Sequence, residues 1–143
     1  MYKVLLPFDS SDASLKAVQF AVKLRELLSA PVRVDLLHVE GTPHNFGDFN
    51  GQALLEHMRK ELTDHGNAVL DKADGPLKAA KIETSRTVEF GNAAAVIAEV
   101  AQRLGSDHIV MGTHGLGGIG SLLLGSVAMK VVQQSKVPVT LVK

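Results

Sequence analysis

The stretch from Met111 to Lys130 has the residue types and spacing from which we expect chemistry. It holds six glycines between an apolar run and a helical pattern. Glycine has no side chain and reaches φ > 0 easily, so successive backbone N–H groups can turn inward around an anion. Where the helical pattern begins, at Gly125 and Ser126, free N–H groups and the positive end of a helix dipole favour negative charge. The stretch therefore predicts a binding site for phosphate groups.

Two familiar phosphate-binding patterns fit this stretch poorly. Gly115, Gly117 and Gly120 match GxGxxG, but no acidic residue follows at the distance where a dinucleotide site needs one for the ribose. The segment from Gly115 to Ser121 has P-loop spacing, yet Ser121 stands where the phosphate-binding Lys is required. Neither a Rossmann nor a Walker site is expected.

A third pattern fits without adjustment: Gly112, two residues, Gly115, nine residues, and then Gly125-Ser126. This spacing resembles the signature of the nucleotide-binding universal stress proteins, and the residues around it are similar to that family as well. The resemblance implies that ATP, or else ADP or AMP, is bound with Mg²⁺ at these four positions, with a further backbone N–H from Val127. The alternative is that the glycines only form a tight connection between strand and helix.

The resemblance extends to residues outside the glycine-rich stretch. Pro7 and Asp9 match a Pro-x-Asp of the family that contributes to the nucleoside end of the site, and a carboxylate there can accept ribose hydroxyls or help hold a cation. Val39 matches the position whose main chain contacts adenine. Without the resemblance, Asp9 reads as a loop or capping carboxylate and Val39 as an ordinary strand end. Lys130 and His114 lie close in sequence but read as solvated side chains.

Apolar runs and helical periodicities predict five strands alternating with four helices, as in an α/β doubly wound parallel sheet with helices on both faces. Residues 1–143 form a single domain in this interpretation. Gly75-Pro76 predicts the end of the second helix, and its polar residues make the third strand an edge strand. The strands are Tyr2–Leu6, Val32–Val39, Ile82–Phe90, His108–Met111 and Val137–Val142, and the helices Ala13–Leu28, Gln52–Asp74, Ala93–Leu104 and Val127–Gln134.

Periodicity does not give the order of the strands, but the resemblance implies 3-2-1-4-5 with the ligand between strands 1 and 4. Ligands of open α/β sheets bind beyond the carboxyl ends of the strands where the order reverses, and the loops with unusual chemistry follow strands 1 and 4. The resemblance also implies a homodimer through the fifth strand, Val137–Val142. The polar segment Glu40–Gly51 is the longest loop and has no predicted role.

Composition narrows the choice of partners and compartment. Fifteen basic and fifteen acidic residues cancel, so neither nucleic acid nor a membrane surface is favoured. No apolar run has the length of a membrane span, and the first one ends too soon for a signal peptide. The absence of cysteine excludes disulfides and thiolate metal sites. We therefore expect a cytoplasmic protein.

The sequence assigns no catalytic residue and no metal ligand. There is no GxSxG motif and no evident general base in the glycine-rich stretch. Two rivals to simple nucleotide binding remain: a slow ATPase or nucleotidyl-transfer enzyme on the same fold, and a dimeric interaction module without nucleotide. Five of the histidines show no metal-ligand spacing: His38, His44, His57, His65 and His108.

Overall fold

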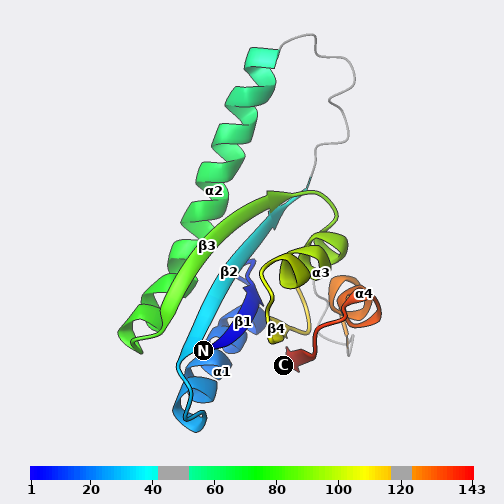
Figure 1. Cartoon of the computed structure of the whole chain (residues 1–143). Coiled ribbons are helices and arrows are strands. Elements are labelled where there is room, and N and C mark those ends of the chain that lie inside the picture. The colour runs from blue at the N-terminus through cyan, green and yellow to red at the C-terminus, as the bar shows by residue number, and fades with distance from the viewer. Residues whose placement is uncertain (42–51, 117–123) are drawn as a thin grey trace.

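The computed structural model describes residues 1–41, 52–116 and 124–143 of the chain (Figure 1). Strands and helices alternate along these ranges, as the periodicities predict. The strands are β1 (Tyr2–Pro7), β2 (Val32–Glu40), β3 (Glu83–Phe90), β4 (His108–Gly112) and β5 (Val139–Val142). The helices are α1 (Asp12–Leu27), α2 (Gln52–Ala79), α3 (Ala93–Arg103) and α4 (Ser126–Gln134).

The strands form one parallel sheet in the order β3-β2-β1-β4-β5, which confirms the predicted fold and strand order. β1 pairs with β2 on one side and β4 on the other. The chain therefore builds the sheet outward from β1 in two opposite directions. This reversal opens a crevice beyond the carboxyl ends of β1 and β4.

Each face of the sheet is covered by one pair of helices. Successive side chains of a strand point to opposite faces, so Val4 and Leu6 of β1 pack beneath α1 and α2, while Leu5 packs beneath α3 and α4. All three side chains are fully buried. Figure 1 shows that the first half of α2 extends well beyond the sheet. None of the helices in the described ranges combines the length and apolarity needed to cross a bilayer.

The predicted end of the second helix at Gly75-Pro76 is wrong, because α2 continues to Ala79. Proline removes one helical hydrogen bond, but Gly75 and Pro76 lie on the exposed side of the helix, where water can serve the freed carbonyl. On the opposite side Ala73 and Leu77 are fully buried in the core. Burial of Leu77 therefore carries the helix through the proline.

The edges of the sheet agree with the prediction in type and differ slightly in length. β3 is an edge strand paired to β2, as its polar residues indicate. β5 begins at Val139, two residues later than predicted, because Pro138 has no N–H to donate. The Pro138 carbonyl instead accepts a hydrogen bond from the Ile109 N–H at 2.9 Å. Pro138 thus stands immediately before β5.

Candidate functional site

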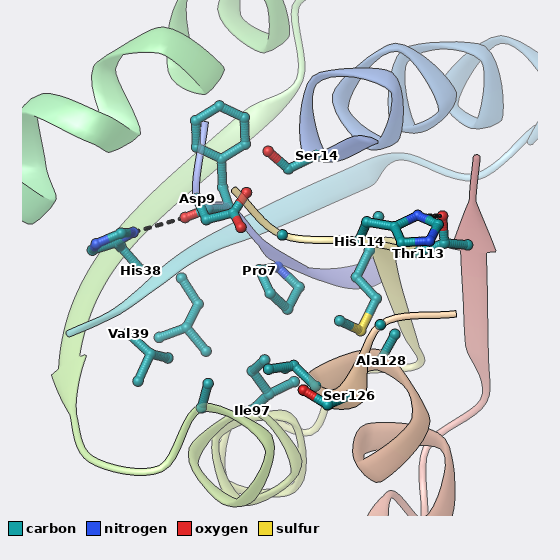
Figure 2. A pocket seen from close by; sticks show the side chains of 18 of the residues that line it. Pro7, Asp9, Ser14, His38, Val39, Ile97, Thr113, His114, Ser126 and Ala128 are labelled. Carbon is teal, nitrogen blue, oxygen red and sulfur yellow. Dashed lines mark hydrogen bonds between the residues drawn. The ribbon is translucent and has the colours of Figure 1, made fainter. Parts of the chain in front are cut away.

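A pocket of about 530 Å³ lies beyond the carboxyl ends of β1 and β4 (Figure 2). Its size is in the range of small-molecule sites. The loops after β1 and β4, the end of β2 and the first turns of α3 and α4 line it. All eight predicted site residues are among its lining residues: Pro7, Asp9, Val39, Gly112, Gly115, Gly125, Ser126 and Val127.

The first turn of α4 supplies main-chain donors at one end of this pocket. Gly125 is the N-cap and makes no side-chain capping bond. The first helical hydrogen bond joins the Met129 N–H to the Gly125 carbonyl. The N–H groups of Ser126, Val127 and Ala128 therefore precede the helical ladder, and they carry the positive end of the helix dipole. This arrangement favours an anion.

Two of the glycines are required by close packing of the main chain. A Cβ atom on Gly112 would lie 2.7 Å from the Ala13 carbonyl carbon, so β4 approaches α1 only because position 112 has no side chain. A Cβ atom on Gly125 would lie 2.9 Å from the Thr113 carbonyl oxygen. That oxygen accepts the Gly125 N–H at 2.7 Å. Gly125 therefore positions α4, while its own N–H is already bonded.

The expectation that the glycines of the loop use positive φ is wrong for the described positions. Positive φ is found at Gly91 and Gly105 but not at Gly112, Gly115 or Gly125. At Gly115 the constraint is steric, because an added Cβ would lie 2.9 Å from the Asp9 Oδ2 atom. Position 115 thus lies directly against the Asp9 carboxylate. Gly117, Gly118, Gly120 and Ser121 lie outside the described residues.

Asp9 links the loop after β1 to the pocket. Its Oδ1 atom accepts the Ser11 N–H at 2.9 Å, which keeps the carboxylate in a turn ahead of α1. Ser11 is the N-cap of α1, and its hydroxyl donates to the His114 carbonyl at 3.3 Å. The loops after β1 and β4 are therefore tied together at the site. Asp9 therefore makes the local turn contact expected of a loop carboxylate, and it also borders the pocket.

The main chain of Val39 faces the other end of the pocket. The Leu37 carbonyl accepts the Phe8 N–H at 2.8 Å, so Leu37 turns its main-chain groups toward β1. Alternate residues of a strand turn these groups to the same side, and β1 pairs no further than Pro7 opposite Leu37. The Val39 N–H and carbonyl therefore face the space beyond β1. Apolar side chains line this end: Leu37, Val39 and Ile97.

The charge of the pocket is low. Among its described lining residues, Asp9 is the only carboxylate, and none is Lys or Arg. Lys130 lies one turn beyond Ser126 with an exposed side chain. His114 lines the pocket, and its Nδ1 atom lies 2.9 Å from the Thr113 hydroxyl. Main-chain dipoles therefore supply most of the positive potential that the described residues offer.

Sequence reasoning missed a cluster at the end of β2. His38 and Glu40 are two residues apart on the strand and thus share a face, and His65 of α2 packs against them. The His-x-Glu spacing on a strand was the available signal, but nothing in the sequence indicated His65 as their neighbour. His57 lies elsewhere on α2 with Glu61, His108 contacts Tyr2 and Thr140, and His44 lies outside the described residues.

Comparison with known proteins agrees with the fold. Residues 1–143 match the universal stress protein family. The chain belongs to this family. A family member of Thermus aquaticus, named universal stress protein in QAH/OAS sulfhydrylase 3′ region, is 34% identical over 145 residues that cover 100% of both chains. The solved structure of the protein MJ0577, from Methanocaldococcus jannaschii, has a TM-score of 0.83 at 25% identity, covering 99% of this chain and 95% of that one.

Some structural relatives in the family bind adenine nucleotides. A universal stress protein solved in complex with cAMP is 26% identical with a TM-score of 0.73, covering 99% of this chain and 97% of that one. A family protein of Arabidopsis thaliana solved with AMP bound has a TM-score of 0.73 at 18% identity, covering 100% of this chain and 92% of that one. At that identity the second likeness supports the fold alone.

Proposed function

We propose that this protein is a cytoplasmic ATP-binding universal stress protein that holds one nucleotide at the carboxyl ends of β1 and β4. The observation that carries the proposal is the pair of main-chain surfaces at opposite ends of one pocket. The first turn of α4 offers N–H groups to phosphate, and the Val39 main chain faces the opposite, apolar end. A nucleotide has phosphate groups for the N–H groups of α4 and a base for the apolar end.

The triphosphate lies against Ser126, Val127 and Ala128 in this proposal. Three successive N–H groups at a helix start bind phosphate oxygens without any positively charged side chain. Gly112 and Gly125 hold β4 and α4 close enough for the phosphates to reach these donors. Gly115 keeps the space beside Asp9 free of a side chain.

Asp9 lies beside the nucleoside and the bound cation in this proposal. Its Oδ1 atom is fixed by the Ser11 N–H, whereas Oδ2 is directed toward Gly115. A carboxylate placed there accepts a ribose hydroxyl or joins the oxygen ligands of Mg²⁺. Mg²⁺ supplies the positive charge that the described lining residues lack, because it neutralises the phosphates through its own charge.

The adenine ring occupies the apolar end. Leu37 and Ile97 provide hydrophobic contact, and the Val39 N–H and carbonyl read the edge of the base. The relative solved in complex with cAMP supports an adenine ligand. The choice of ATP over AMP rests on the resemblance of the spacing of Gly112, Gly115 and Gly125-Ser126 to the signature of the nucleotide-binding members of the family.

The protein forms a homodimer through residues 137–142 in this proposal. β5 ends the sheet opposite β3, and the half-buried apolar residues of Val139–Val142 leave one edge of the strand without a partner in the described chain. An exposed apolar edge strand favours pairing with a second copy. Light scattering tests this: a dimer is expected for the wild type, and a monomer would contradict the proposal.

The ligand itself is identified by purifying the protein without added nucleotide, denaturing it, and analysing what is released by chromatography and mass spectrometry. We expect ATP at about one per chain. Calorimetry on the stripped protein should then rank Mg-ATP above ADP, AMP and cAMP. Recovery of ADP or AMP in place of ATP would favour the slow ATPase. No released nucleotide and no thermal shift with Mg-ATP would favour the interaction module.

A further inference from the structure

The end of β2 and the middle of α2 bring together three side chains that the nucleotide proposal does not use. His38 and Glu40 project from the same face of β2 toward α2, and His65 meets them from that helix. The His38 Nε2 atom lies 3.3 Å from Glu40 Oε1, and the His65 Nδ1 atom lies 2.6 Å from the same oxygen. All three ligand-type atoms lie within 4.8 Å of one another.

The hydrogen bond on the far side of His38 fixes which nitrogen faces the cluster. Its Nδ1 atom lies 2.8 Å from the Phe8 carbonyl oxygen (Figure 2). A carbonyl oxygen only accepts, so Nδ1 carries the proton. The neutral ring then presents the Nε2 lone pair to Glu40. Histidines that ligate metals commonly donate their other N–H to a carbonyl in this way, which fixes both tautomer and ring orientation.

Two acceptor atoms that face each other in a buried place favour a cation between them, although the Glu40 oxygen also contacts His65 Nδ1. His38 is only 8% exposed, and the Glu40 side chain is 14% exposed. The cation is either a proton on His38 or a metal ion that all three residues share. Burial of a carboxylate without such a partner is unfavourable.

The separation of His38 and Glu40 matches a tetrahedral metal ion. Nitrogen and oxygen ligands about 2.0–2.1 Å from Zn²⁺ lie about 3.3 Å from each other at tetrahedral angles. The His38 to Glu40 separation is 3.3 Å. The contact between His65 and Glu40, at 2.6 Å, has to open by less than about 1 Å. His65 can make that adjustment because its side chain is 64% exposed, and the same exposure gives the ion a path in.

The packing of α2 holds the cluster in register. Gly66 lies directly after His65, and an added Cβ there would be 2.8 Å from Val88 and 3.1 Å from the His38 ring. The absence of a side chain at position 66 lets the helix approach the sheet closely at this point. His65 is thereby brought within reach of the end of β2.

We propose that His38, Glu40 and His65 form a binding site for a divalent transition metal, with Zn²⁺ the best-matched ion. Two imidazoles and one carboxylate are a recognised zinc ligand set, and three protein ligands leave a fourth position for water or another ligand. The metal joins α2 to the end of β2. Because His38 and Phe8 also line the nucleotide pocket, the two sites share a wall. The proposal does not depend on which nucleotide is bound.

The test uses untagged protein that has been stripped with a chelator and titrated with Zn²⁺ by calorimetry and with Co²⁺ by visible absorption. We expect about one ion per chain, a zinc-dependent rise in Tm, and Co²⁺ bands of tetrahedral intensity. His65→Ala and Glu40→Gln should each weaken binding by at least about tenfold. His65 is exposed, so its variant should fold, and its ATP affinity should be unchanged.

His57→Ala is the matched control, because His57 is an exposed histidine of the same helix beside a carboxylate, Glu61, at 3.2 Å. It should bind zinc like the wild type. Equal zinc affinity in His57→Ala and His65→Ala, or no saturable binding by the wild type, would overturn the proposal. NMR of the imidazole nitrogens gives an independent result: zinc should shift His38 Nε2, whereas a ring that stays protonated and insensitive to zinc means an ion pair alone.

Discussion

Two regions lie at the same end of the sheet but work by different means. One is the α4 cradle, formed by Gly112, Gly125 and the N–H groups of Ser126 to Ala128. The other is the cluster of His38, Glu40 and His65. The cradle presents main-chain groups, whose positions depend on where side chains are absent. The cluster presents side chains from two elements. Substitution of a ligand-type side chain should therefore disable the cluster, whereas the cradle should be sensitive mainly to changes that move or remove main-chain groups.

Gly115→Val should have the largest effect on nucleotide binding. The new side chain would start 2.9 Å from the Asp9 Oδ2 atom and displace the carboxylate into the pocket. We expect ATP affinity to fall by about 100-fold or more, which corresponds to about 2.7 kcal/mol. Calorimetry measures the ATP affinity, and Gly115→Ala, which adds a smaller side chain, should lower it less. Wild-type affinity in a folded Gly115→Val protein would place the phosphates elsewhere.

Gly112→Ala should lower the stability of the fold. Its Cβ would meet main-chain and side-chain atoms of Ala13 at 2.7 Å, and overpacking of this kind costs about 1–3 kcal/mol. Gly41→Ala is the control, because apart from its chain neighbours nothing lies within 4 Å of a Cβ added at that position. Urea unfolding of the stripped proteins should show a loss of stability for Gly112→Ala and little change for Gly41→Ala. Equal midpoints would show that Gly112 has no packing role.

We expect His108, which lies outside the histidine cluster, to contribute to the pH dependence of stability. Burial lowers the pKa of His108 below its usual 6.5, and its ring is bonded to the Tyr2 and Thr140 hydroxyls. As pH falls through about 6.5 the unfolded chain takes up this proton before the folded one. Stability should therefore fall as the solution becomes more acidic. His108→Gln should flatten that slope in chemical unfolding from pH 7.5 to 5.5, and an unchanged slope would assign the dependence to other groups.

Lys130→Ala should have the smallest effect. If main-chain dipoles hold the phosphates, an exposed lysine one turn away adds only a screened attraction. We expect ATP affinity to change by less than about threefold, which is under about 0.7 kcal/mol. Titrations at low and high salt check this. A loss of tenfold or more would mean that the cradle depends on this side chain after all.

The sequence predicted the fold because its elements follow from local patterns, the alternating apolar runs and helical periods. The glycine spacing and the family resemblance that it carries pointed to eight residues that line the pocket, and their role in binding stays a prediction. The sequence erred at Pro76, where burial of Leu77 outweighs a local helix-breaking signal. It also misjudged Gly115, where φ is not positive and an added Cβ would instead meet the carboxylate of Asp9, more than a hundred residues away.

The histidine cluster was not predictable in the same way. His38 and His65 are joined only because Gly66 lets α2 lie close to β2, and no spacing within one element records that approach. Main-chain sites are marked by glycines in a single segment. Side-chain sites built across elements become visible only when the packing is known.

Ser126→Pro tests the main-chain account of nucleotide binding most directly. Ser126 is the first residue of α4, where proline is tolerated, and Gly125 already has the extended conformation, φ −71 and ψ 157, that precedes proline. The substitution removes one N–H and the hydroxyl, whereas Ser126→Ala removes the hydroxyl alone. Calorimetry with Mg-ATP should show a loss of about tenfold or more for Ser126→Pro relative to Ser126→Ala, with both proteins folded. Equal affinity of the two variants would contradict the account.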